Sequence, residues 1–177
     1  LADYASIVQQ KVAKDYTDKN LKAFKKDSKD FLELISDMDD LLSTRSDFLL
    51  GIWLNTAKAC GTTAEEKKLY EMNARNLITT WGNKENRLHE YACKQWGGML
   101  NGFYKVRWEK FFNQVFKDFQ EKKTFDQENF DKASKDWEWN WIHETETYPD
   151  KPKGNTVEIS RKIFNKYHPL VVKAYTH

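Results

Sequence analysis

Apolar residues recur along this chain at intervals of three and four positions, the spacing of a helix that buries one face. No stretch longer than a few residues alternates between apolar and polar side chains, as a half-buried strand would. The three prolines are Pro149, Pro152 and Pro169, so residues 1–148 are able to form long helices. The clearest loop is 147–154. The pattern predicts an all-α protein, a bundle of six or seven helices without a sheet.

Seven helical segments are expected from the periodicity and from the residues that begin and end each run. They cover residues 2–16, 18–42, 46–59, 63–81, 86–119, 125–145 and 156–167. Thr62 or Thr63 caps the fourth segment, because the acidic side chains that follow suit the positive end of a helix dipole. Ser46 caps the third segment, with Phe48 on its buried side. The last segment is expected to end before Pro169.

Composition favours a single soluble helical domain over residues 1–177. Hydrophobic residues make up 40% of the chain and charged residues 32%, which is typical of a globular protein. The net charge is +2 and the charges are mixed along the sequence, so no basic block predicts a nucleic-acid partner. No apolar run approaches the roughly 18 residues that a membrane span needs.

The chain begins at Leu1, with neither an initiator methionine nor a signal peptide. We therefore expect it to be a mature product or a fragment of a larger protein. Cys60 and Cys93 are the only cysteines. Their spacing indicates no metal site, and a disulfide between them is possible.

Glycine is concentrated in residues 70–108, a stretch that is also rich in aromatic and amide side chains. Gly97, Gly98 and Gly102 fall within an expected helix, where each glycine costs about 1 kcal/mol relative to alanine. They indicate either close contact with another helix or room for something beside the backbone.

Trp81 stands at the expected end of the fourth helix, directly before Gly82 and a polar turn. A bundle core accounts for most aromatic residues of this stretch, but it does not require one at this place. A large aromatic ring at a helix end can stack on a flat, partly apolar ligand such as a sugar ring. Core packing remains the alternative for this tryptophan.

The same stretch resembles the C-terminal helical domain of the α-N-acetylglucosaminidases, glycoside hydrolase family 89. Several spaced motifs carry the resemblance, and they occur in the family's order. They are Asn73, Arg75, Thr79, Trp81 and Gly82; Tyr91, Ala92, Lys94 and Gln95; Gly98; and Phe103, Tyr104, Arg107 and Trp108. Residues 46–54, 154–157 and 162–169 extend it outward, so it covers most of the chain from about residue 40 onward.

The resemblance implies that the chemistry lies elsewhere in a longer parent protein. In this family two catalytic glutamates are carried by an upstream (β/α)8 barrel, which this chain does not contain. The parent would remove terminal α-linked N-acetylglucosamine from glycans by retaining hydrolysis, without a metal or organic cofactor. It would be secreted or periplasmic, or lysosomal in a eukaryote. This domain would pack on the barrel, close one side of the sugar pocket and be inactive by itself.

Trp81 and Tyr91 are the substrate-binding residues that the resemblance implies. Trp81 would pack on the pyranose or the acetamido methyl group, and Tyr91 would donate a hydrogen bond through its hydroxyl. The alternative is that both are core aromatics. No catalytic residue is expected within the chain. Two alternatives for the whole domain also stay open: a stand-alone glycan-binding module, and a purely structural or interaction bundle.

Other combinations of residues have simpler explanations. Glu144 and Glu146 alternate, which on a helix points them apart, so they are a poor catalytic pair. His89 and Cys93 could share a helix face and reach a metal, but a third ligand is missing, and a surface histidine and a buried thiol explain them better.

Two polar residues and three aromatics of the matching motifs have structural interpretations. Asn73 and Arg75 are expected to make structural hydrogen bonds or ion pairs at a helix interface. The aromatic residues Trp96, Tyr104 and Trp108 are expected in the core or in packing between domains.

Overall fold

The computed structural model of this chain describes residues 1–85 and 92–176. Its seven α-helices are α1 (Ala2–Thr17), α2 (Leu21–Leu42), α3 (Leu50–Ala59), α4 (Ala64–Ile78), α5 (Val106–Glu121), α6 (Gln127–His143) and α7 (Thr156–Tyr175). A 3-10 turn, η1 (Ser46–Phe48), precedes α3, and a π-helical turn, η2 (Leu100–Lys105), leads directly into α5. The described residues contain no strand, which confirms the all-α prediction.

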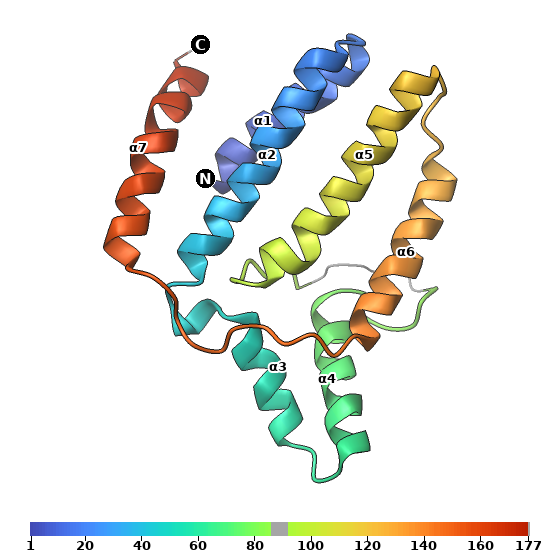
Figure 1. Ribbon diagram of the computed structural model, residues 1–177, viewed down its shortest axis with the longest axis vertical. Coiled ribbons are helices and arrows are strands. Elements are labelled where there is room, and N and C mark those ends of the chain that lie inside the picture. Colours follow the sequence, from blue (N-terminus) through green and yellow to red (C-terminus); the bar gives the residue numbers. More distant parts are fainter. Residues whose placement is uncertain (86–91, 177) are drawn as a thin grey trace.

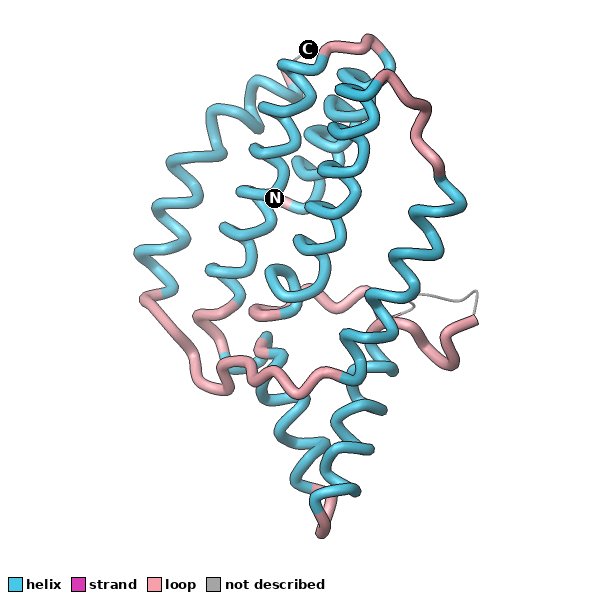
Figure 2. Tube along the Cα trace, turned by 45° about the vertical axis from the view of Figure 1, so that its right-hand side comes forward, coloured by secondary structure: helices cyan, strands magenta, loops and turns pink. Residues whose placement is uncertain are grey.

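The helices form two groups that meet end to end (Figure 1). Helices α1 and α2 form an antiparallel hairpin, and α5 and α7 both pack on α2. Helices α3 and α4 form a second hairpin, which projects from the opposite end of the molecule (Figure 2). Helix α6 lies beside α5 in the view of Figure 1 and reaches down to contact α4.

Each group has its own hydrophobic core. In the first, Phe24 and Phe31 of α2 each meet Phe112 of α5 edge to face, with ring centroids 6.0 Å and 5.9 Å apart. Such pairs add stabilisation beyond the burial of their area. In the second, Phe103 of η2 packs between Trp137 and Trp141 of α6. The abundant aromatic residues therefore serve mainly as core.

A buried carboxylate joins the two groups. Asp39, near the end of α2, accepts hydrogen bonds from the backbone N–H groups of Gly98 (2.8 Å) and Asn101 (2.9 Å). Burial raises the pKa of the Asp39 carboxyl, and the two backbone donors oppose that rise. Asp39 thus acts as a cap for the π-helical turn at the start of the α5 segment.

The predicted helix over residues 86–119 is wrong over residues 92–98. Residues 86–91 lie outside the described part, and residues 92–98 are not helical. Gly97 instead pairs with the chain before α3: its N–H donates to Phe48 O (2.7 Å), and Leu50 N–H donates to its carbonyl (3.1 Å). A side chain at Gly97 would meet Ser43 Oγ at 2.3 Å. The glycine therefore permits a close approach between distant segments.

Two predicted helix ends near α3 and α4 need correction. Ser46 does not cap α3, because it begins η1, and Phe48 is exposed rather than buried. Helix α4 ends at Ile78, before Trp81. The cap of α4 was predicted correctly: Thr63 and Glu66 form a reciprocal capping box.

Helix α7 does not end before Pro169, contrary to the prediction, but runs through it to Tyr175. The turn that precedes the proline is held against α2. There Tyr167 Oη donates to Asp37 Oδ2 at 2.7 Å, and Lys166 Nζ lies 2.5 Å from the same oxygen. These tertiary contacts offset the loss of one backbone hydrogen bond at the proline.

The connection between α6 and α7 crosses the junction of the two groups (Figure 1). It is a loop over residues 147–154, as predicted. A Cβ atom at Gly51 would meet the Pro149 carbonyl oxygen at 2.3 Å, and one at Gly102 would meet the Tyr148 ring at 2.7 Å. The close contact expected of the glycines is real, but Gly102 contacts this loop rather than a neighbouring helix.

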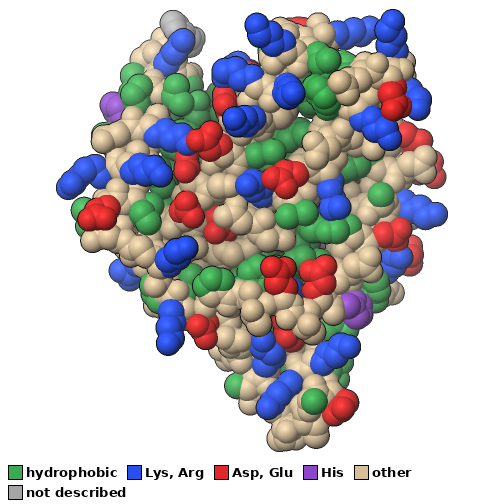
Figure 3. All heavy atoms as spheres, viewed as in Figure 1, with side chains coloured by type: hydrophobic (Ala, Val, Ile, Leu, Met, Phe, Trp, Pro, Cys, Tyr) green, Lys and Arg blue, Asp and Glu red, His purple; other side chains and the backbone are tan. Residues whose placement is uncertain are grey.

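Charged side chains of both signs are intermixed over the face of the molecule shown in Figure 3. This distribution agrees with the mixed charges along the sequence and shows no broad basic surface on that face. Among the described residues, no helix is both long and apolar enough to cross a membrane.

Candidate functional site

Trp81 lies just beyond the end of α4, in a tight turn that displays its ring. Its backbone is left-handed, with φ of 53°, which is uncommon for a large residue. The Trp81 N–H donates to the Asn76 carbonyl at 2.9 Å. The side chain is 37% exposed, whereas most other tryptophans of the chain pack in the two cores. The structure therefore places this predicted residue at the surface.

The side chain of Asn76 closes this turn from the helix side. Its Oδ1 accepts from the Gly82 N–H at 2.8 Å, and its Nδ2 donates to the Gly82 carbonyl at 2.5 Å. One amide thus pairs with both polar groups of Gly82. Together with the Trp81 N–H bond, this arrangement fixes the backbone on both sides of the exposed ring.

Two threonines anchor the chain beneath Trp81. Thr79 and Thr80 are both almost fully buried. Thr79 Oγ1 donates to the Arg75 carbonyl at 2.7 Å, which ties the residue back to the last helical turn. The two residues before Trp81 are therefore buried, whereas the Trp81 side chain is 37% exposed.

A buried ion pair holds α4 itself in place. Arg75 is completely buried, and it donates to Glu71 Oε1 through Nε (3.2 Å) and Nη2 (2.8 Å). Lys58 of α3 lies 3.5 Å from the other oxygen of Glu71. Arg75 Nη2 also donates to the Glu146 carbonyl at 2.6 Å. The interpretation of Arg75 as a structural ion-pair residue is confirmed.

The guanidinium group of Arg75 also rests on aromatic rings. Its Cζ lies 4.8 Å from the Trp141 ring centroid and 5.5 Å from that of Tyr148. Trp141 Nε1 donates to the Tyr148 hydroxyl at 3.3 Å, and burial raises the pKa of that phenol. Arg75 therefore links α4 to α6 and to the segment that follows α6.

The other predicted positions differ in outcome. Tyr91 and His89 lie outside the described residues, so Trp81 is the one predicted contact whose surroundings the structure shows. Asn73 makes no side-chain hydrogen bond within the described part and is exposed, so its structural interpretation is wrong. Cys60 and Cys93 are both exposed, and neither is in a disulfide there.

The structure also shows no metal site in residues 1–85 and 92–176, where no group of three acidic, histidine or cysteine side chains converges. Glu144 and Glu146 are exposed residues beyond the end of α6.

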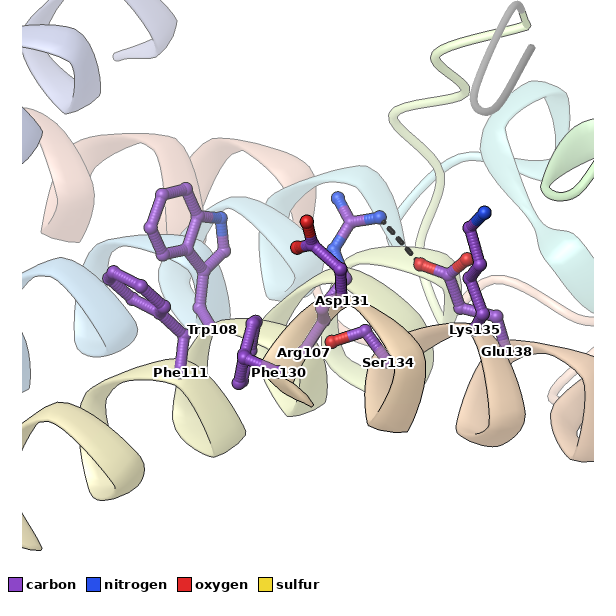
Figure 4. A pocket seen from close by; sticks show the side chains of 8 residues that line it. All are labelled: Arg107, Trp108, Phe111, Phe130, Asp131, Ser134, Lys135 and Glu138. Atoms are coloured by element: carbon purple, nitrogen blue, oxygen red, sulfur yellow. Dashed lines mark hydrogen bonds and ion pairs between the residues drawn. The ribbon is translucent and has the colours of Figure 1, made fainter. Parts of the chain in front are cut away.

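A groove between α5 and α6 is a feature that the sequence did not predict (Figure 4). It has a volume of about 470 Å³. Trp108, Phe111 and Phe130 form its apolar end, and at the other end Arg107 Nη1 donates to Glu138 Oε1 at 3.0 Å. No local motif could have indicated this groove, because it depends on how far α6 stands from α5.

Comparison with known proteins places the chain in a family. Residues 1–166 match the family described as the α-N-acetylglucosaminidase (NAGLU) C-terminal domain. The chain is 36% identical over 137 residues to human α-N-acetylglucosaminidase, a match that covers 77% of this chain and 18% of the human protein.

Solved structures of family 89 glycoside hydrolase from Clostridium perfringens have the same fold. The complex with 2-acetamido-1,2-dideoxynojirimycin gives a TM-score of 0.82 at 29% identity, over 94% of this chain and 20% of that one. The complex with the substrate GlcNAc-α-1,4-galactose gives 0.82 at 30% identity, over 93% and 19%. The chain thus spans about a fifth of the length of these relatives. It belongs to the family of α-N-acetylglucosaminidase C-terminal domains, within glycoside hydrolase family 89.

Proposed function

We propose that this domain packs on the (β/α)8 catalytic barrel of a longer parent enzyme and closes one side of its sugar pocket. The pocket would hold terminal α-linked N-acetylglucosamine, and the parent would be an α-N-acetylglucosaminidase of a secreted, periplasmic or lysosomal compartment. The observation that carries the proposal is the exposed ring of Trp81 in a turn fixed by Asn76 and Gly82.

Trp81 has the properties of a sugar contact. An indole ring offers a flat apolar face to the C–H groups of a pyranose or to an acetamido methyl group. A ring whose backbone is already fixed loses little conformational entropy on binding. Tyr91, ten residues further along the chain, is proposed as the second contact, through its hydroxyl group.

The role of these contacts is to position the substrate rather than to react with it. Retaining hydrolysis needs two carboxyl groups roughly 5 Å apart across the glycosidic bond, and we assign them to the barrel of the parent. Binding energy from a residue outside the reacting centre can hold the sugar in a productive orientation. No cofactor enters this proposal.

Support for this assignment comes from the relatives. The human relative is named α-N-acetylglucosaminidase. The clostridial structures are described in complex with GlcNAc-α-1,4-galactose and with PUGNAc, the latter with a TM-score of 0.83 over 94% of this chain. These ligands fit a site for N-acetylglucosamine in the enzyme to which this domain belongs.

The proposal is tested by assaying hydrolysis of an aryl α-N-acetylglucosaminide by the parent enzyme and by the 177-residue chain. We expect turnover by the parent alone. Turnover by the chain itself would place catalytic carboxylates within it and overturn the division of roles.

Two other results would favour the alternative functions. Binding of N-acetylglucosamine to the isolated chain, abolished by Trp81→Ala, would indicate a glycan-binding module. A Trp81→Ala parent that loses stability but keeps its KM would indicate a purely structural domain.

A further inference from the structure

The segment that follows Trp81 borders the groove between α5 and α6. Lys84, three residues after Trp81, forms an ion pair with Asp136 of α6. It also lines a hollow together with Asp131 and Lys135, two residues that line the α5–α6 groove as well. The chain beyond Trp81 therefore lies against the α6 side of this groove.

The segment that follows Tyr91 reaches the α5 side of the same groove. Cys93 and Lys94 lie beside the hydroxyl group of Tyr104, in the π-helical turn that leads into α5. The centroid of the Tyr104 ring lies 5.6 Å from Cζ of Arg107, which lines the groove. The segments next to both predicted sugar contacts thus border one groove.

The lining of the groove combines an apolar end with a polar end (Figure 4). Three aromatic rings, those of Trp108, Phe111 and Phe130, form the apolar end. A sugar presents C–H groups that pack on aromatic rings and hydroxyl groups that hydrogen-bond to polar side chains. The volume of about 470 Å³ lies within the roughly 300–1,000 Å³ of small-molecule sites. The groove therefore has the size and the lining of a site for part of a glycan.

The charges at the polar end of the groove balance. Arg107 and Lys135 are positive, and Asp131 and Glu138 are negative. Arg107 and Glu138 also form a hydrogen-bonded ion pair of 3.0 Å, and Glu138 is 5% exposed. Electrostatic complementarity selects partners of opposite charge. A lining without net charge therefore favours a neutral ligand over a sulfated or uronic one.

We propose that the α5–α6 groove binds the part of the glycan to which the terminal N-acetylglucosamine is attached, and that this part is neutral. The inference rests on the proposed function, since it takes the terminal sugar to lie beside Trp81 and Tyr91. The following sugars leave the pocket as the glycan continues, and the groove is a hollow that the two contact segments border.

The groove would act on substrate specificity rather than on the reaction itself. Binding energy from a remote part of a substrate can be used to orient the bond that reacts. An aryl α-N-acetylglucosaminide has no second sugar, so it gains nothing from the groove. The parent enzyme should therefore discriminate between a glycan and an aryl glycoside through this surface, although the same carboxyl groups cleave both.

Blocking the groove in the parent enzyme tests the proposal. Ser134 lines it from α6, and Ser134→Trp places an indole ring in the space that a sugar would fill. The readout is the ratio of kcat/KM for two substrates: GlcNAc-α-1,4-galactose extended by one neutral sugar, and an aryl α-N-acetylglucosaminide. The ratio should fall about tenfold or more. An unchanged ratio in a variant with the wild-type thermal midpoint would overturn the proposal.

Ala133→Trp is the matched control. It adds the same side chain at the neighbouring position of α6, which is exposed and does not line the groove. Its ratio should stay within about twofold of the wild type. An equal fall in both variants would mean that bulk on α6, rather than a blocked groove, changes the selectivity, and this would also contradict the proposal.

A milder pair of substitutions covers the case in which Ser134→Trp does not fold. Asp131→Ala with Lys135→Ala removes one charge of each sign from the groove and should lower the ratio about threefold or more. Lys117→Ala with Glu121→Ala removes the same charges from exposed positions on α5 and should leave the ratio unchanged. If the two pairs behave alike, the groove does not hold the glycan.

Sulfation of the same trisaccharide tests the class of ligand. In the wild-type parent, a sulfate on the second sugar should lower kcat/KM about fivefold or more, because the balanced lining offers it no excess positive charge. Ser134→Trp should reduce that difference. Equal or faster cleavage of the sulfated glycan would contradict selection of a neutral one.

The two substrates also separate this proposal from the proposed function. Trp81→Ala should raise KM for both, since both carry the terminal N-acetylglucosamine. If it does so while Ser134→Trp leaves the ratio unchanged, the sugar contact stands and the groove fails. If Ser134→Trp lowers the ratio while Trp81→Ala leaves KM unchanged, the groove stands and the Trp81 contact fails.

Discussion

One side-chain amide, that of Asn76, is hydrogen-bonded to both the N–H and the C=O of Gly82. The two residues bracket Trp81, whose own N–H bonds to the Asn76 carbonyl. This arrangement fixes the turn beyond the end of α4, where the Trp81 side chain is 37% exposed. The proposed sugar contact depends on this local geometry.

Asn76→Ala removes both amide bonds at once. We expect a loss of about 1–2 kcal/mol in the free energy of unfolding, because each bond contributes roughly 0.5–1.5 kcal/mol net. In the parent, KM should rise severalfold with little change in kcat, since the ring would lose its fixed position. Denaturant titration and steady-state kinetics measure the two effects. Asn113→Ala, an exposed change on α5, is the control and should alter neither.

Arg75→Met tests the buried ion pair beneath the site. It leaves Glu71 buried without its main partner, which we expect to cost about 3–5 kcal/mol. The double variant with Glu71→Met should be less destabilised than the sum of the two single variants by at least about 1 kcal/mol. Strict additivity in urea denaturation would show that the two side chains do not interact as the structure indicates.

Substitution of two glycines should have unequal effects. Gly51→Ala directs a methyl group at the Pro149 carbonyl oxygen, which belongs to the backbone, whereas Gly102→Ala meets the side chain of Tyr148. Overpacking typically lowers the free energy of unfolding by about 1–3 kcal/mol. We expect the larger loss at Gly51, because the atoms that its methyl group would meet belong to the backbone and cannot move by a side-chain rotation.

A shorter side chain at position 148 provides the check on this interpretation. Tyr148→Leu should reduce the further loss caused by Gly102→Ala, and it should leave the loss caused by Gly51→Ala unchanged. Differential scanning calorimetry of the single and double variants measures this. An equal response at both glycines would contradict the packing described for the 147–154 loop.

Two buried carboxyl groups make stability depend on pH. Burial and the neighbouring Asp27 raise the pKa of Asp15. Burial also opposes ionisation of Asp27, but hydrogen bonds from Lys11 and Asp15 outweigh it, so its pKa is lowered. Lys11 Nζ lies 2.7 Å and Lys26 Nζ 3.3 Å from oxygens of Asp27. Of the two carboxyl groups, Asp15 therefore holds a proton more tightly than Asp27.

The sign of the effect follows from the raised pKa of Asp15. The folded state holds this proton more tightly than the unfolded chain does, so the contribution is largest at acidic pH and is lost as pH rises through the folded pKa. Asp15→Asn does not titrate, and its thermal midpoint should fall less than that of the wild type as pH rises from about 4, the ordinary pKa of an aspartate, toward neutrality. Asp47→Asn, an exposed control distant in sequence from this pair, should keep the wild-type slope. A wild-type slope in Asp15→Asn would contradict this assignment.

The sequence predicted the elements whose signals are local. The capping box at Thr63 and Glu66, the apolar period of α2 and the loop before Gly154 each lie within one short segment, and all three are present. The extension of α7 through Pro169 could not be predicted, because it depends on contacts with α2, more than one hundred residues away in sequence.

In the candidate site, too, only features with a local sequence signal could be predicted. The sequence left two interpretations of Trp81 open, a ligand-stacking ring or a core residue, and the structure leaves its side chain 37% exposed, beyond the end of α4. The left-handed turn and the pairing of Asn76 with Gly82 had no sequence signature of their own. Likewise, the glycines predicted a close contact but not its partner, since Tyr148 reaches Gly98 and Gly102 from a loop far along the chain.

The most direct test of the proposed role is the kinetics of the parent enzyme with Trp81→Ala, measured on an aryl α-N-acetylglucosaminide. We predict that KM rises about tenfold or more, the loss of roughly 1.4 kcal/mol of binding, while the thermal midpoint stays within about 2 °C of the wild type. An unchanged KM in a normally folded variant would contradict the assignment of this domain as one wall of the sugar pocket.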